Sequence, residues 1–243
     1  MGITFLFKDI GIFLNSMEIK LIDVNNGKYN VSVIADDEYI GPTIANGYEW
    51  DGWMREDIKK HYKKDTDILD IGANIGYNTL MFSDYGPVSS FEPVFHQIVT
   101  KNAKQNQLRH PINIYPCALS NENKSMEIFL PKHGCQSNSH INYGGTSFHP
   151  ISSFFSETGI VVKCERLDDI YEGVPSIIKI DVEGHELQVL EGAKETIRKH
   201  KPMILVEIHD FTTDNGVHTF LKEMGYMDIP ETRPEAMFLY TSA

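Results

Sequence analysis

Glycines and carboxylates stand together where the apolar run of residues 67–71 gives way to a turn. Gly72 and Gly76 let the backbone pass close to a ligand, and the helix expected just after them points its unpaired N–H groups at the same place. Glu92 follows the next apolar run, 22 residues after Asp70, which is the spacing at which an acidic side chain binds a ribose. This strand, turn and helix therefore predict a site for a nucleoside cofactor.

The charge of the turn indicates which cofactor to expect. Asp70 would repel a pyrophosphate, and Asn74 stands where a dinucleotide site has its middle glycine. S-adenosylmethionine carries an ammonium and a sulfonium, so an acidic turn suits it better. Asn78 is expected either to hold the carboxylate of this cofactor or simply to open the helix. A nicotinamide dinucleotide, or glycines that serve packing alone, are the open alternatives.

A second polar group follows two buried strands expected late in the chain. A hydroxyl acceptor needs a general base, and the intrinsic pKa of an imidazole makes His209 the leading candidate, with Asp181 as its rival. Glu183 is expected either to take part in the chemistry or to stabilise the start of the following helix. Asp181, Glu207 and His209 are also suitable ligands for a divalent metal such as Mg²⁺ or Mn²⁺, and the sequence leaves this open.

Apolar runs alternate with helical patterns through most of the chain, which is typical of an α/β protein with a mostly parallel sheet. Because ligands bind at the carboxyl ends of such strands, the polar groups above are expected along one edge of the sheet. Lys179 lies inside a strand that should be buried on both faces, and we expect it to pair with a neighbouring carboxylate. The last strand is expected to be antiparallel, in a closing hairpin over residues 226–240. Strands are expected at 67–71, 87–92, 112–116, 176–181, 203–209 and 237–241, and helices at 76–84, 94–107, 185–200 and 214–224.

The first part of the chain has a different pattern. Residues 17–40 alternate around an Asn-Asn-Gly turn and predict an antiparallel hairpin, and a helix follows at 54–62. We therefore divide the chain into an N-terminal extension at 1–64, which acts as a lid or brace, and a cofactor-binding domain at 65–243 with a substrate loop at 131–160. The aromatic residues of the extension are expected to pack in the core or to stack on adenosine or a sugar. They are Tyr48, Trp50 and Trp53.

Composition restricts the partners and the compartment. The chain has 243 residues with 41% apolar content, which suits one well-filled domain, and a formal net charge of −12. Without a concentrated basic face, a nucleic-acid partner is not expected. Cys117, Cys135 and Cys164 are odd in number and widely spaced, which favours reduced thiols and a cytoplasmic location. Charged residues interrupt the apolar run at 3–14, so no transmembrane segment is expected. A homo-oligomer remains possible.

Three sequence blocks, in this order, carry a resemblance to a known family. They are Asp-Ile-Gly-Ala-Asn-Ile-Gly-Tyr at 70–77, Phe-Glu-Pro at 91–93 and Ile-Lys-Ile-Asp-Val-Glu-Gly-His-Glu at 178–186. With them, the chain resembles the FkbM family of S-adenosylmethionine-dependent methyltransferases over roughly residues 45–225. The resemblance implies a class I Rossmann-like fold with a seven-stranded sheet, and O-methylation of sugar, glycan or natural-product hydroxyls.

The resemblance also implies roles for individual residues. It places one group around the methionine part of the cofactor, Glu92 on the ribose and Asp181 near the methyl group. It places Cys117 and Ala118 beside the adenine. The group around the methionine part comprises Asp70, Gly72, Asn74 and Gly76. The expected function is therefore transfer of a methyl group to a hydroxyl of a small molecule or glycan, with a nicotinamide-dependent oxidoreductase and a non-catalytic adenosine-binding module as alternatives.

Overall fold

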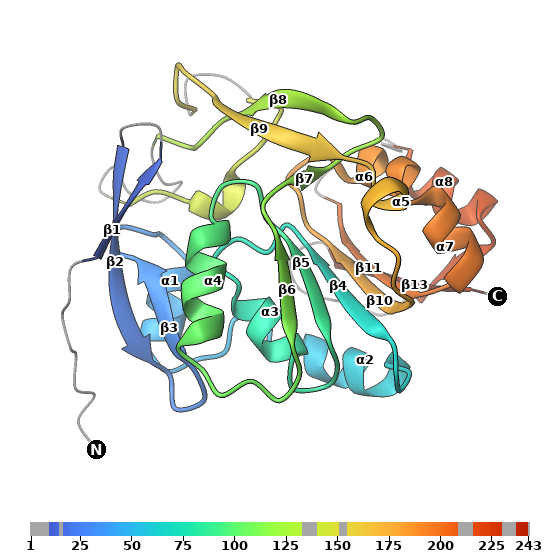
Figure 1. Cartoon of the computed structure of the whole chain (residues 1–243), viewed down its shortest axis with the longest axis horizontal. Coiled ribbons are helices and arrows are strands. Elements are labelled where there is room, and N and C mark those ends of the chain that lie inside the picture. The colour runs from blue at the N-terminus through green and yellow to red at the C-terminus, as the bar shows by residue number, and fades with distance from the viewer. Residues whose placement is uncertain are drawn as a thin grey trace.

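A seven-stranded sheet forms the centre of the computed structural model (Figure 1), which describes residues 10–14, 17–132, 140–150, 155–208, 216–229 and 237–242. The strand order is β12-β13-β11-β10-β4-β5-β6. The five strands from β11 to β6 are parallel, whereas β13 is antiparallel to both β11 and β12. This confirms the predicted fold, including the antiparallel last strand and the closing hairpin. The strands are β4 (Asp67–Ile71), β5 (Val88–Phe91), β6 (Ile112–Tyr115), β10 (Pro175–Ile180), β11 (Met203–Glu207), β12 (Tyr226–Asp228) and β13 (Met237–Ser242).

Helices follow the strands at the expected places, but short helices at Ile40–Ala45 and Leu167–Ile170 were not expected, and one expected helix is divided. The helix expected over 185–200 is two helices, which meet at Ala193. A Cβ atom on Gly192 would overlap the carbonyl oxygen of Ser120, so the chain touches another backbone where the first helix ends. Apolar periodicity continues through this point and could not reveal the break. The helices are α1 (Ile40–Ala45), α2 (Met54–His61), α3 (Tyr77–Phe82), α4 (His96–Lys104), α5 (Leu167–Ile170), α6 (Glu186–Gly192), α7 (Lys194–His200) and α8 (Val217–Glu223).

The N-terminal extension forms a small antiparallel sheet of β1 (Ile10–Leu14), β2 (Met17–Asn25) and β3 (Asn30–Ile34). The predicted hairpin is confirmed, and β3 lies beside α4 (Figure 1). Buried Asn102 of α4 accepts a hydrogen bond from the Ser32 backbone N–H at 2.6 Å and donates one to the Ile75 carbonyl at 2.8 Å. The extension therefore shares a core with the turn at residues 72–76 after β4, through α4, which lies between them.

A third sheet was not predicted. It consists of β7 (Ala118–Leu119), β9 (Ile160–Glu165) and β8 (Lys124–Ile128) in that order, and it lies across one end of the central sheet (Figure 1). Its outer strand β8 is largely exposed, so it lacks the apolar run of a buried strand. Residues 133–139 and 151–154 of the expected substrate loop lie outside the described residues. Among the helices described, none combines the length and apolar character needed to cross a membrane.

Candidate active site

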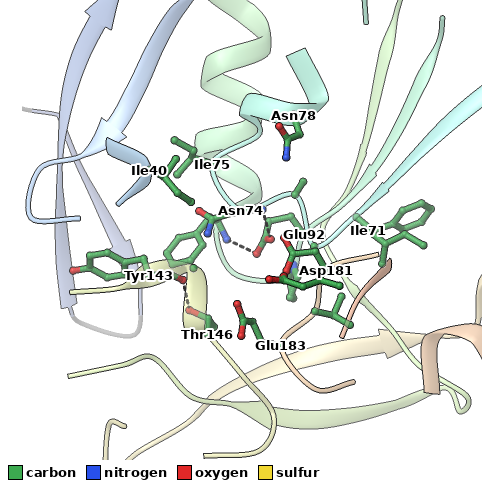
Figure 2. A pocket seen from close by; sticks show the side chains of 18 of the residues that line it. Ile40, Ile71, Asn74, Ile75, Asn78, Glu92, Tyr143, Thr146, Asp181 and Glu183 are labelled. Atoms are coloured by element: carbon green, nitrogen blue, oxygen red, sulfur yellow. Dashed lines mark hydrogen bonds between the residues drawn. The ribbon is translucent and has the colours of Figure 1, made fainter. Parts of the chain in front are cut away.

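A cavity of about 320 Å³ opens at the carboxyl ends of β4, β5, β10 and β11 (Figure 2). Its wall comes from the turn after β4 with the start of α3, the strand ends, β7, the N-terminal extension, and the end of β8 with the segment after it. Trp50 of the extension, which was expected either in the core or against the ligand, lines the cavity. Tyr39 and Ile40 also line it, and the sequence did not identify them. The polar lining residues include Asn74, Asn78, Glu92, Lys179, Asp181, Glu183 and Glu207.

The turn after β4 takes its shape from residues in the left-handed region. Gly72 has φ +79°, and a Cβ atom there would overlap the carbonyl oxygen of Asp181, so only glycine lets this turn contact the turn after β10. A Cβ atom on Gly76 would lie 2.8 Å from the Val99 side chain of α4. Gly72 and Asn74 line the cavity, whereas Gly76 sets the close contact of the turn with α4.

Glu92 joins this turn to the end of β5. Its carboxylate accepts backbone hydrogen bonds from Asn74 and Val94 at 2.8 Å and from Phe95 at 3.0 Å, and Figure 2 shows the first of these. Burial raises the pKa of Glu92 to about 7, although the three N–H donors favour the charged form. The carboxyl group is thus fixed in the cavity wall.

Asp70 lies beneath the cavity and not at the mouth of the turn, so the expected position is wrong. It is fully buried within β4, and the sheet register places it beside Lys179 of β10. Lys179 Nζ lies 3.6 Å from Asp70 and 3.0 Å from Asp181, and it donates to the Gly72 carbonyl at 2.9 Å. This confirms the expected pairing of Lys179 and gives Asp70 the role of fixing that lysine.

The two residues expected beside the adenine differ in position. Ala118 lines the cavity together with Leu119, but Cys117 is buried in the adjacent apolar cluster and is not among the lining residues. Burial raises the pKa of the Cys117 thiol to about 11, so it is protonated at neutral pH. Cys117 and Cys164 are both free, and Cys135 lies outside the described residues.

Three carboxyl groups meet in the cavity where β10 and β11 end. Asp181, Glu183 and Glu207 each place an oxygen within 4.8 Å of the others. Glu207 is buried, and its pKa is raised by that burial, by the negative charge of Asp181 and by the hydrogen bond between the two carboxyl groups. Lys179 counters the charge of Asp181. His209, the leading base expected from sequence, lies outside the described residues.

Comparison with known proteins gives the family of this chain. Residues 70–227 match the family model for the Methyltransferase FkbM domain, which is well over half of the chain. The chain belongs to the FkbM methyltransferase family.

Two named relatives of this FkbM-family chain are also methyltransferases. Hexuronic acid methyltransferase AglP of Haloferax volcanii is 29% identical over 166 residues, which cover 66% of this chain and 63% of that protein. Methyltransferase 1 of Beauveria bassiana is 27% identical over 202 residues, which cover 74% and 80%. The crystal structure of Methyltransferase FkbM from Methylobacillus flagellatus has a TM-score of 0.51 at 19% identity and is similar over 74% of this chain and 44% of its own. That last similarity shows the fold alone.

In the FkbM-family chain, Asn78 has a partner that the sequence did not reveal. Its Nδ2 donates to Asp51 Oδ2 at 2.9 Å, so this donor is already used and does not face the cavity as a free group for a carboxylate. Asp51 also accepts a hydrogen bond from Trp53 Nε1 at 3.3 Å. Burial raises the pKa of Asp51. An aspartate between two tryptophans was the only sequence signal for this residue.

The segment after β8 completes the cavity. Ile141 pairs with Asp37 of the extension, and the Tyr143 hydroxyl donates to Asp36. Tyr143 lines the cavity together with Thr146, and Figure 2 shows both beside Ile40 and Glu183. The described part of the expected substrate loop is therefore bound to the N-terminal extension.

Proposed function

We propose that this protein is an S-adenosylmethionine-dependent O-methyltransferase that modifies a hydroxyl of a sugar, glycan or related small molecule. The observation that carries the proposal is one cavity, in an FkbM-family chain, that is lined both by the fixed carboxyl group of Glu92 and by the carboxyl cluster of Asp181, Glu183 and Glu207. When bound, the cofactor supplies a methyl group on a positively charged sulfur. Family membership favours this chemistry over the nicotinamide alternative.

The cofactor half of the cavity supports the proposal. Glu92 presents a carboxylate that can accept hydrogen bonds from a ribose diol, and the wall near it is apolar at Phe95, Ala118 and Leu119, as an adenine requires. Asp70 fixes Lys179, which in turn holds the Gly72 carbonyl and Asp181. These contacts keep the turn in place for an aligned transfer.

The acceptor half contains a general base. The pKa of Glu207 is raised, which favours its protonated form, whereas Asp181 has Lys179 Nζ at 3.0 Å as a counter-charge. Asp181 would accept the proton of the acceptor hydroxyl as that oxygen takes the methyl group, which the bound cofactor would supply. His209 stays a predicted alternative for this role, and Glu183 a predicted participant beside Asp181.

A divalent cation is a second candidate for activating the acceptor. Asp181, Glu183 and Glu207 offer carboxylate oxygens, which Mg²⁺ and Mn²⁺ prefer, and their closeness suits a single ion. These three residues would hold it, and it would lower the pKa of an acceptor hydroxyl. The cation would also neutralise the mutual repulsion of the three groups.

The acceptor class is supported by a relative and by charge. AglP is named for hexuronic acid, and a sugar would offer the hydroxyls that the carboxyl cluster can bind. The net charge of −12 favours a small molecule or glycan over a nucleic acid.

The first test is calorimetric titration with S-adenosylhomocysteine, followed by an acceptor screen that measures its release. We expect binding by the wild type and turnover with a hydroxylated sugar. Asp181→Asn should lower turnover by about 10²- to 10⁴-fold without loss of cofactor binding. Asp228→Asn on the sheet edge is the matched control and should leave turnover unchanged.

Other results would redirect or end the proposal. Absence of cofactor binding by the wild type would end it, and binding without turnover on any acceptor would favour the non-catalytic module. Loss of turnover in His209→Ala with full activity in Asp181→Asn would move the base to His209. Loss of turnover after chelation, with recovery when Mg²⁺ or Mn²⁺ is added, would establish the metal.

A further inference from the structure

Asp51 joins the N-terminal extension to Asn78 of α3, which lines the cavity. It precedes α2 and lies outside residues 70–227, so it is not part of the matched family domain. It adopts φ +51°, in the left-handed region, and is held there by hydrogen bonds from Asn78 and Trp53. Its neighbour Trp50 and its partner Asn78 both line the cavity.

Two buried amide oxygens of the segment that follows β4 have no hydrogen-bond partner among the described residues. Asn78 is 6% exposed, and its Oδ1 has no hydrogen-bond partner among the described residues, because the donor end of the amide faces Asp51. The buried Oδ1 of Asn74 has no partner in the described chain either. The charge of Asp51 also interacts with the charges of Asp181 and Lys179. A ligand group at this place must therefore donate hydrogen bonds.

Lys179, the cation whose charge acts on Asp51, is not available to bind an anionic ligand group. Lys179 already contacts Asp70, Asp181 and the Gly72 carbonyl, and it lies in the sheet beneath the turn. A ligand carboxylate would meet Asp51 and an amide oxygen and would be repelled. A ligand ammonium would find a charged acceptor and a neutral acceptor side by side, which is the arrangement of a strong charge-assisted hydrogen bond.

We propose that Asp51, with Oδ1 of Asn78, binds the ammonium group of the methionine part of the cofactor. The N-terminal extension thereby supplies a cofactor-binding residue and is more than a brace. This inference rests on the proposed function, since it concerns the same cofactor.

The test compares two ligands that differ only in the amino group: S-adenosylhomocysteine and its desamino analogue, in which hydrogen replaces the ammonium. Wild-type protein should bind the first about 10- to 100-fold more tightly. Asp51→Asn should remove most of this preference by weakening S-adenosylhomocysteine alone. Asparagine tolerates the left-handed backbone and can still accept from Asn78, so the fold should persist.

Glu49→Gln is the matched control, because Glu49 lies in the same segment but is paired with Arg55. It should keep the wild-type preference. Equal binding of the two ligands by wild type, or an equal loss for both in Asp51→Asn, would overturn the inference and leave the proposed function standing. If neither ligand binds wild type, the proposed function itself fails. Asp51→Ser should lose the same preference, so the inference can still be tested if Asp51→Asn does not fold.

Discussion

Removal of Lys179 tests whether the charges beneath the cavity hold the fold together. Lys179 is 2% exposed and Asp70 is fully buried, so neither charge is solvated. At an effective dielectric constant of about 20, charges separated by the 3.6 Å between Lys179 Nζ and Asp70 attract by roughly 4–5 kcal/mol. In Lys179→Met that attraction is lost and the Asp70 carboxylate stays buried without its counter-charge.

The expected loss of stability follows from this geometry. Breaking a buried pair by removing one partner costs about 3–5 kcal/mol, which for a chain of this size lowers Tm by roughly 6–20 °C. Urea titration followed by circular dichroism measures the loss. Lys199→Met, the same change on an exposed position of α7, should cost less than about 0.5 kcal/mol.

A double variant tests the cause. Lys179→Met combined with Asp70→Asn removes both charges, so it should be more stable than Lys179→Met alone by at least about 1 kcal/mol. A loss below about 1 kcal/mol in the single variant would refute the reasoning. So would a double variant as unstable as the sum of the two single changes.

Two further predictions concern pH. His185 is buried beside Ser120, and burial together with His149 lowers its pKa to about 4. As the pH falls below about 6.5, this histidine therefore takes up a proton in the unfolded chain while it stays neutral in the folded protein. The free energy of unfolding of the wild type should therefore fall by up to roughly 3 kcal/mol between pH 6.5 and 4. That of His185→Gln, measured by urea titration at both pH values, should fall correspondingly less. For Glu92, whose pKa is about 7, affinity for S-adenosylhomocysteine should fall up to about tenfold per pH unit below pH 7, because the protonated group accepts fewer ribose hydrogen bonds. Calorimetry on Glu92→Gln should show weaker binding that does not vary with pH, and an unchanged slope would contradict this role.

The central sheet could be predicted from sequence because its strands are buried on both faces. Runs such as 176–181 and 203–209 are largely apolar and carry polar residues at their carboxyl ends, so strands could be predicted at these places along the chain. The same regularity placed Glu92, Asp181 and Glu183 at the strand ends, where the structure brings them into one cavity. Glu207, weighed from sequence as a metal ligand or as the acid that orients His209, lies in the same cluster as Asp181 and Glu183.

The errors have a different physical origin. The position of Asp70 depends on the register between β4 and β10, which sets it opposite Lys179, and a linear pattern does not contain that register. Tyr39 reaches the cavity, and Asp51 reaches Asn78 in the cavity wall, through tertiary packing of the extension, so no periodic pattern identifies them. The sheet of β7, β8 and β9 was missed because β8 is short and exposed.

The position of β4 in the middle of the sheet has a consequence for how the molecule can be divided. One neighbour, β5, comes from residues 88–91, and the other, β10, from residues 175–180. The turn that surrounds the cavity is held on both sides only after a loop of about a hundred residues has closed, at an entropic cost that grows slowly with its length. A fragment that ends before β10 would leave an open, apolar strand edge and no counter-ion for Asp70. The parts of the cavity wall that come from β4 and β5 and from β10 therefore fold together. Neither part is an independent module that could be transferred to another protein alone.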